Sequence, residues 1–259
     1  MLRSIALALL AALGSTGPLE SCYGYEDHLT LMPDRSGKID FVMSEKTSEG
    51  TLDKVKAGIF QLVQDTRGFA AFTMPALESK DGWAIVRCTV YFEDINLLNY
   101  IEDRTHGGDR FMEEKHDECI HFHLMTRPND KNYFILHVED HLFSKMPGGR
   151  GRIDWEDIKK DSENVVIRRV TVPGKVQWRD AFRDFQRLEV RTVTYERSPK
   201  TIGKMEKDRE YQITGSRRVE FVGNEIPDAE LAAFKKELAA AKAAWPKIKA
   251  ELEAAPAKK

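Results

Sequence analysis

Residues 27–44 read DHLTLMPDRSGKIDFVMS, and this stretch decides the fold class. Apolar and polar residues alternate on both sides of residues 33–37, whose Pro, Asp, Ser and Gly favour a tight reversal of the chain. The stretch therefore predicts a β-hairpin. Centring the turn on Arg35 places the large apolar residues of the two strands on one face, Leu31 opposite Ile39 and Leu29 opposite Phe41.

A second hairpin is predicted around residues 128–130, where Pro, Asn and Asp separate the alternating runs 119–126 and 132–139. Its expected register is the one in which the apolar residues form one continuous face. A turn centred on Asn129 pairs Phe122 with Leu136, Leu124 with Phe134 and Ile120 with Val138.

Six of the seven histidines lie between residues 106 and 141, which makes this region a candidate site. The register of the second hairpin places His121 opposite His137, with His123 two residues along on the same polar face. Imidazoles on paired strands can converge on Zn or Cu, because cross-strand β-carbons lie about 5 Å apart. One prediction is therefore a metal site of His121, His123 and His137. The alternative is a solvated polar face, since no established metal-binding spacing is present.

The rest of the chain mixes strand-like and helix-like segments. Helices are predicted from Thr51, from a cap at Asp94, at residues 180–187, and from Asp228 to an end or a kink at Pro246. Further strands are predicted at Trp83–Phe92, Asn164–Val172, Arg187–Glu196 and Glu210–Val222. This order indicates an α+β fold, with a mainly antiparallel β-sheet built from hairpins, a few packed helices and a C-terminal helix.

Domain organisation follows from composition. Residues 147–152, PGGRGR, predict a flexible Gly-rich loop between two parts of one domain. The expected parts are a signal peptide at 1–21, an N-terminal α+β domain at 22–146, the loop, a β-rich second half at 153–227, a C-terminal helix at 228–252 and a frayed tail at 253–259.

The composition is that of a globular protein: 41% of the 259 residues are hydrophobic and 32% are charged. Lys and Arg number 40 against 42 Asp and Glu, so the net charge of -2 supplies no basic field to attract nucleic acid. The sequence also has no Gly-x-Ser-x-Gly elbow, and the Ser residues have no recognisable base, so we predict no catalytic residues.

The N-terminus has the features of an export signal. Arg3 is followed by an apolar run at residues 5–13, which is too short to span a bilayer. Leu19-Glu20-Ser21-Cys22 then resembles the lipobox of bacterial lipoproteins at Leu19, Ser21 and Cys22, whereas Glu20 departs from it. The resemblance implies that Cys22 is the lipid-attachment residue. Ordinary signal cleavage without lipid is the alternative.

A broader likeness accompanies the lipobox. After it come the hairpin, a helix, a long strand ending in Phe-Glu-Asp-Ile and a later Val-Thr-Val-Pro-Gly-Lys-Val run. This order resembles uncharacterised exported lipoproteins of bacteria, and loosely the LppM-type lipoprotein domain, over roughly residues 22–178. The motifs are turns and strands, so the resemblance implies an envelope module on a lipid tether and carries over no functional residues.

Two further features leave alternatives open. Cys88 lies on the apolar face of its strand, whereas Cys119 would lie opposite Glu139 on a polar face, so a disulfide between them and a buried free thiol at Cys88 are both considered. Arginines between residues 168 and 197 interleave with Trp178, which suggests a surface for headgroups or polyanions. Acidic residues among them reduce the net charge of that surface.

Together these patterns predict a membrane-anchored lipoprotein, exported to the bacterial cell envelope, that acts as a non-enzymatic binding or scaffolding module. Its expected partner is membrane lipid, through an acyl anchor on Cys22, and we expect neither nucleic acid nor a cofactor. The alternative is a metal-binding or metal-dependent protein that uses the histidine cluster of the second hairpin with Zn or Cu.

Overall fold

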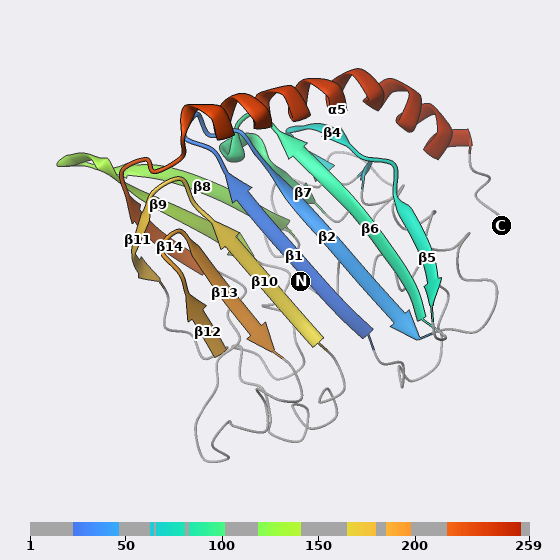
Figure 1. The fold of residues 1–259 in the computed structure, drawn as a ribbon, viewed down its shortest axis with the longest axis horizontal. Helices are drawn as coiled ribbons and strands as arrows, with labels where there is room; N and C mark the ends of the chain where they lie inside the picture. The colour runs from blue at the N-terminus through green and yellow to red at the C-terminus, as the bar shows by residue number, and fades with distance from the viewer. Residues whose placement is uncertain are drawn as a thin grey trace, which may run out of the picture.

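The computed structural model describes residues 23–46, 63–64, 66–80, 83–101, 119–140, 165–179, 185–197 and 217–254. These residues form two β-sheets and a long C-terminal helix, α5 (Asp228–Ala254), which runs across one end of the larger sheet (Figure 1). The fold is thus α+β, as predicted from the hairpin patterns.

The larger sheet, sheet A, has the strand order β12-β13-β10-β1-β2-β6-β4, with β5 also paired to β6. Its strands are β1 (Tyr23–Leu31), β2 (Gly37–Lys46), β4 (Phe69–Phe72), β5 (Ala76–Lys80), β6 (Trp83–Phe92), β10 (Val165–Thr171), β12 (Phe185–Leu188) and β13 (Thr192–Arg197). Neighbours are antiparallel except β1 and β10, which are parallel.

The smaller sheet, sheet B, is antiparallel throughout its described pairs and has the order β11-β14-β9-β8-β7-β3. Its strands are β3 (Thr66–Arg67), β7 (Asn99–Ile101), β8 (Cys119–Arg127), β9 (Asp130–Asp140), β11 (Lys175–Arg179) and β14 (Arg217–Val222). A 3-10 helix, η1 (Ile95–Leu97), lies between β6 and β7 in the chain, and the Asp94 carboxylate accepts the Asn96 amide at its start, in agreement with the predicted cap.

The first hairpin turns at Asp34 rather than at Arg35, so the predicted register is wrong by two residues. Leu29 pairs with Ile39, and Leu31 pairs with Gly37. The Met32 amide donates to the Ser36 carbonyl at 2.8 Å, and Arg35 takes a left-handed φ of 71°, which closes the loop at 32–36. A shift by two residues keeps each side chain on its face, so the predicted apolar face is retained and buried.

Gly37 is required by the close approach of β6. A β-carbon at this position would lie 2.5 Å from the Phe92 ring and 2.2 Å from the Thr30 carbonyl oxygen. Phe92 is itself fully buried. The glycine that ends the turn therefore also leaves room for the Phe92 ring in the core.

The second hairpin is displaced in the same way. Its pairs are Phe122 with Val138, Leu124 with Leu136 and Thr126 with Phe134, not those of a turn at Asn129. The displacement arises near the tip, where Arg127 pairs with Asp130 and β9 carries extra residues at 131–133. Leu124 and Leu136 are buried, and the half-buried Phe122 and Phe134 pack against the same core, so the predicted apolar face is confirmed.

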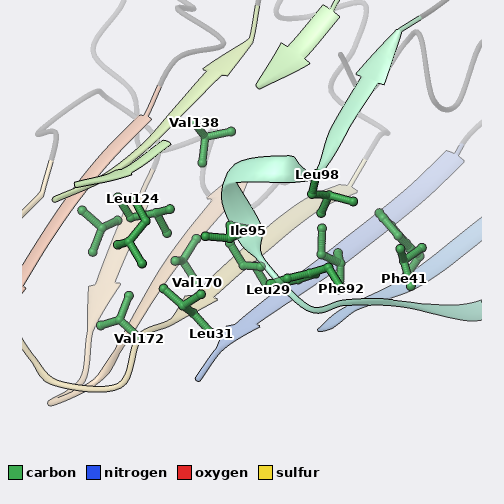
Figure 2. Packing of buried hydrophobic residues seen from close by; sticks show 14 of the residues in the cluster. Leu29, Leu31, Phe41, Phe92, Ile95, Leu98, Leu124, Val138, Val170 and Val172 are labelled. Atoms are coloured by element: carbon green, nitrogen blue, oxygen red, sulfur yellow. The ribbon is translucent and has the colours of Figure 1, made fainter. Parts of the chain in front are cut away.

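The main hydrophobic core lies between the two sheets. Figure 2 shows Ile95, from η1, between Leu29 of sheet A and Leu124 of sheet B, and Leu98 belongs to the same cluster. Helix α5 adds Leu252 to this core and closes a second cluster around Phe234 and Leu238. The predicted apolar stripe of the helix is confirmed; of the end or kink predicted at Pro246, the end is excluded, because the helix runs through the proline, in line with the predicted span of 228–252. The helix continues to Ala254, and Trp245 and Ile248, which lie on either side of the proline, both pack against the core.

Other segments differ from prediction or lie outside the described residues. The strand predicted at Arg187–Glu196 is broken into β12 and β13, because the chain reverses where the Glu189 amide donates to the Thr192 carbonyl. Phe185–Arg187 is strand rather than helix, and so is Asn99–Ile101, because the helix predicted from Asp94 ends at Leu97; the sequence patterns did not predict β3, β4, β5 and β11. Most of the helix from Thr51, and the loop at 147–152, fall outside, so the proposed domain boundaries stay a prediction.

A buried ion pair joins the parallel strands. Arg168 of β10 lies directly opposite Asp27 of β1, and its Nε is 3.1 Å from the Asp27 Oδ2. The Arg168 side chain is 3% exposed and faces the same side of sheet A as the core residue Val170. A guanidinium in this position requires a carboxylate, because desolvating a single charge is far more costly than desolvating a pair.

We expect Asp27→Asn to lower the free energy of unfolding by about 3 kcal/mol, because it removes the negative charge that lies beside the buried Arg168 guanidinium. Chemical denaturation of the purified chain measures this. The double variant Asp27→Leu/Arg168→Met should recover much of the loss, since it removes both charges. A loss below about 1 kcal/mol in Asp27→Asn would mean that the pair does not constrain the fold.

Leu136→Ala should cost about 2 to 5 kcal/mol, because it opens a cavity at a position that is 1% exposed. His123→Ala, on the other face of the same hairpin, should cost less than about 1 kcal/mol. Denaturation midpoints of the two variants, compared at equal m-value, distinguish the faces. Equal costs would show that the assignment of faces is incorrect.

Candidate binding surface

His123 and His137 of the second hairpin lie on the face of sheet B that is turned away from the core. His123 is exposed and pairs directly with His137, which is half-buried. The predicted pairing of His121 with His137 is therefore wrong, and His121 pairs with Glu139. The cause is the two-residue displacement at the hairpin tip, which changes partners while preserving faces.

The proposed metal ligands are only partly within the described side chains. Those of Cys119, His121 and Glu139 lie outside them, and Cys119 pairs along the backbone with Ile101 rather than with Glu139. Among the side chains that are described, no group of three or more His, Cys, Asp or Glu could hold a metal ion. The set His121, His123 and His137 stays a prediction.

An exposed tryptophan stands beside this hairpin. Trp178 of β11 is 44% exposed, and the Arg218 guanidinium lies over its ring, 5.3 Å from the centroid. Arg218 also forms an ion pair with Glu220, at 2.5 Å between Nη2 and Oε1. The cation–π contact and the ion pair together hold the guanidinium against the ring.

Tyr133 of β9 forms the other half of the arrangement. Its hydroxyl donates a hydrogen bond to the Glu220 carboxylate, and the Arg127 guanidinium lies 4.8 Å from the centre of its ring. The hydrogen bond to Glu220 raises the pKa of Tyr133, because the phenolate could not donate it. Glu220 therefore links two arginine–aromatic pairs.

A row of cross-strand partners runs through Glu220, the residue that links the two pairs. Met125, Ile135, Glu220 and Trp178 are successive partners across β8, β9, β14 and β11, and Met125 is 51% exposed. The tip of the β8–β9 hairpin extends beyond the neighbouring strands (Figure 1). We define the hairpin surface as Met125, Arg127, Tyr133, Trp178 and Arg218. Trp, Tyr, Arg and Met are the residue types enriched at binding interfaces.

Sequence reasoning found only part of this surface. The arginines between 168 and 197 were considered as one basic and aromatic face, but the structure separates them: Arg168 is buried, Arg169 pairs with Glu26, and Arg191 pairs with Glu230. Trp178 instead contacts Arg218, which lies outside that range of the sequence. The alternation of RRVEFV at 217–222, with Arg218 and Glu220 on one face, was the available signal.

The outer face of sheet A carries a polar network. His28 Nε2 lies 2.8 Å from the Thr171 hydroxyl, which lies 2.9 Å from the Thr192 hydroxyl. Burial lowers the pKa of His28, while the Asp40 carboxylate acts in the opposite direction. Although an imidazole beside a hydroxyl resembles a base and nucleophile, β1 and β10 each have a strand on both sides. The backbone amides of these strands are hydrogen-bonded within the sheet and are not free to stabilise an oxyanion. The arrangement therefore fits a hydrogen bond between neighbouring strands better than a catalytic site.

Of the three cysteines, only Cys88 has a described side chain. Cys88 is a free thiol in the core, and burial raises its pKa to about 12, which makes it unreactive. Cys22 lies outside the described residues. Among the described helices, none is long and apolar enough to cross a membrane.

Removing the Glu220 carboxylate should lower the pKa of Tyr133 towards that of free tyrosine. With Glu220 present, ionisation of Tyr133 breaks a hydrogen bond and places two negative charges close together, and the variant removes both of these costs. A ¹³C NMR titration of the tyrosine Cζ signals in Glu220→Ala measures the shift. Glu220→Gln, which keeps an acceptor without the charge, should fall between the two. An unchanged Tyr133 titration would rule out the link through Glu220.

Comparison with known proteins gives structural neighbours only. No protein-family model and no curated protein matches the chain. The folded domain of Mycobacterium tuberculosis LppM, solved by NMR, is similar with a TM-score of 0.39 and 9% identity, over 83% of this chain and 98% of that domain. Two structures of a two-domain M1 zinc metallopeptidase, bound to L-tryptophan and to L-arginine, have TM-scores of 0.26 and identities of 8% and 9%. Each of these two matches covers 79% of this chain and 43% of the peptidase chain, so this chain spans less than half the length of the peptidase.

Proposed function

We propose that this chain is a lipoprotein of the bacterial cell envelope, anchored through Cys22, that acts as a non-enzymatic binding or scaffolding module. The observation that carries the proposal is the position of Cys22. It follows an export-like segment and directly precedes Tyr23, the first residue of β1. A lipidated N-terminus at Cys22 would leave every described strand intact.

The position of Cys22 also implies an orientation. A lipid on this residue would hold the start of β1 at the membrane surface. Strand β1 has 9 residues, so the turn at its other end, with α5 above it, would lie about 30 Å further along the strand. A thioether-linked diacylglyceryl group with a further acyl chain supplies enough buried methylenes for stable anchoring.

Binding is the activity that the described surface supports best. The hairpin surface exposes an aromatic ring, a thioether and two guanidinium groups on rigid strands, which gives a partner both apolar area and directed hydrogen-bond donors. Its aromatic rings are fixed in place by the cation–π contacts, so little side-chain entropy would be lost on association.

The lipid anchor is tested by mass spectrometry of the protein extracted from membranes of an expressing bacterium. We expect the mature chain to begin at Cys22 and to carry diacylglyceryl mass, and Cys22→Ala to move into the soluble fraction. Ser21→Ala is the matched control, because a small residue remains before the cysteine and anchoring should persist. A mature wild-type chain that begins at any other residue would end the lipoprotein proposal.

A further inference from the structure

The four strands that carry the hairpin surface have an excess of positive charge among their described side chains. Strands β8, β9, β11 and β14 contribute four described basic residues and two described acidic ones: Arg127, Lys131, Lys175 and Arg218 against Asp130 and Glu220. The chain as a whole has a net charge of -2, so the excess belongs to this part of the molecule and not to the overall composition. A local positive charge of this kind favours an anionic partner.

The positive charge that a partner can use lies at the hairpin tip. The Arg218 guanidinium already pairs with the Glu220 carboxylate. The Arg127 guanidinium instead lies over the Tyr133 ring, and within the described part of the chain neither Arg127 nor the exposed Lys131 forms an ion pair with a carboxylate. Because a guanidinium carries its N–H donors around its edge, contact with a ring leaves donors for a carboxylate of a partner.

The end of the hairpin surface at β11 is apolar. Trp178 is 44% exposed and Met125 is 51% exposed. Glu220 lies between Trp178 and the tip, but it is 9% exposed, and its carboxylate is occupied by Arg218 and by the Tyr133 hydroxyl. The surface is therefore cationic at one end and apolar at the other, with little free negative charge between them.

The pairing of the strands sets the distance between the two ends. Tyr133 of β9, which holds the Arg127 guanidinium, lies opposite Val222 of β14. Trp178 of β11 lies opposite Glu220, two residues earlier in β14. Two strand spacings of about 4.8 Å, combined with two residues along the strand, give about 12 Å. An extended peptide covers this distance with about three or four residues.

The hairpin tip lies at the end of the molecule that is remote from Cys22. Beside the tip, the Gly223 amide donates to the Asn132 carbonyl, and the Glu225 amide donates to the carbonyl of Pro173, which follows β10. Strand β10 is parallel to β1, so the tip lies where both strands end, whereas Cys22 precedes the start of β1 (Figure 1). With the anchor proposed above, on which this step rests, the tip is held away from the anchoring membrane.

A peptide fits these features better than a polyanion or a lipid. A polyanion of uniform charge would contact the tip but leave Trp178 and Met125 uncovered. Headgroups of the anchoring membrane lie at the opposite end of the molecule. An extended peptide can carry a carboxylate and an apolar side chain a few residues apart, which matches the two ends of the surface.

We propose that the hairpin surface binds an extended acidic peptide segment of another protein. An Asp or Glu carboxylate of the segment pairs with Arg127 and Lys131. An apolar side chain three or four residues away covers Trp178 and Met125. This assignment rests on the binding function proposed above and names its partner: Arg127 selects for negative charge, and Trp178 supplies the apolar contact.

The test is selection from a displayed library of random peptides on the purified chain, followed by titration of the enriched peptides. We expect enriched sequences to carry Asp or Glu three or four residues from an aromatic or aliphatic residue. Arg127→Glu and Trp178→Ala should each weaken binding by at least about tenfold. The matched control is Arg87→Glu, which makes the same charge change at an exposed position of β6 and should leave the affinity unchanged.

An exchange of charges separates direct contact from loss of folding. A peptide in which lysine replaces the selected acidic residue should bind Arg127→Glu more tightly than it binds the wild type. The proposal is overturned if no peptide is enriched above background, if the enriched peptides lack acidic residues, or if the lysine peptide does not prefer the variant.

Two further measurements address other occupants of the surface. Vesicles of phosphatidylglycerol and phosphatidylcholine should not displace the selected peptide from Cys22→Ala, which carries no anchor. Sedimentation of Cys22→Ala should show no self-association that Arg127→Glu removes. Displacement would assign the surface to lipid, and such self-association would assign it to a second copy, so either result contradicts the proposal. Because Cys22→Ala should bind the peptide normally, failure of the anchor and failure of the peptide site are distinguished.

Discussion

The ion pair between Asp27 and Arg168 is the constraint on which the rest of the structure depends. It sits inside sheet A at the parallel junction of β1 and β10, strands that are far apart in the sequence. A slip of one residue would turn the guanidinium to the outer face, and a slip of two would separate it from the carboxylate. The buried charge therefore permits one register between the two strands.

The register between β1 and β10 also positions residues beyond the ion pair itself. It brings Thr171 beside Thr30 and within reach of His28, which completes the hydrogen-bonded network of the outer face. The same register fixes where β10 ends, and Pro173 and Gly174 then lead the chain directly into β11 of sheet B. The place of Trp178 at the edge of sheet B is thus set by a contact inside sheet A.

The sequence patterns predicted which face of each strand is buried more accurately than they predicted which residues pair across neighbouring strands. Alternation assigned the core side of β2, β6, β8 and β9 correctly, since burial of apolar residues on one face depends only on the period of a strand. The registers of both hairpins were wrong by two residues, because each depends on local geometry at the turn: the left-handed Arg35 in one and the extra residues of β9 in the other. A shift by two leaves the hydrophobic pattern unchanged, so that pattern alone does not select between the two registers. The pairing of Trp178 with Arg218 was harder still, because it joins strands that only the tertiary fold makes neighbours.

The two outer faces differ in how their polar groups are used. On sheet A the hydroxyls and charges bond to each other or to α5, as Tyr91 and Lys38 both do to Glu237. A partner docking there would have to replace hydrogen bonds that already exist, which yields little net free energy. On sheet B about half of the surface of Trp178 and Met125 is in contact with water, so covering these residues releases that water. The gain on association is therefore greater at sheet B, and this is the face for which we propose binding.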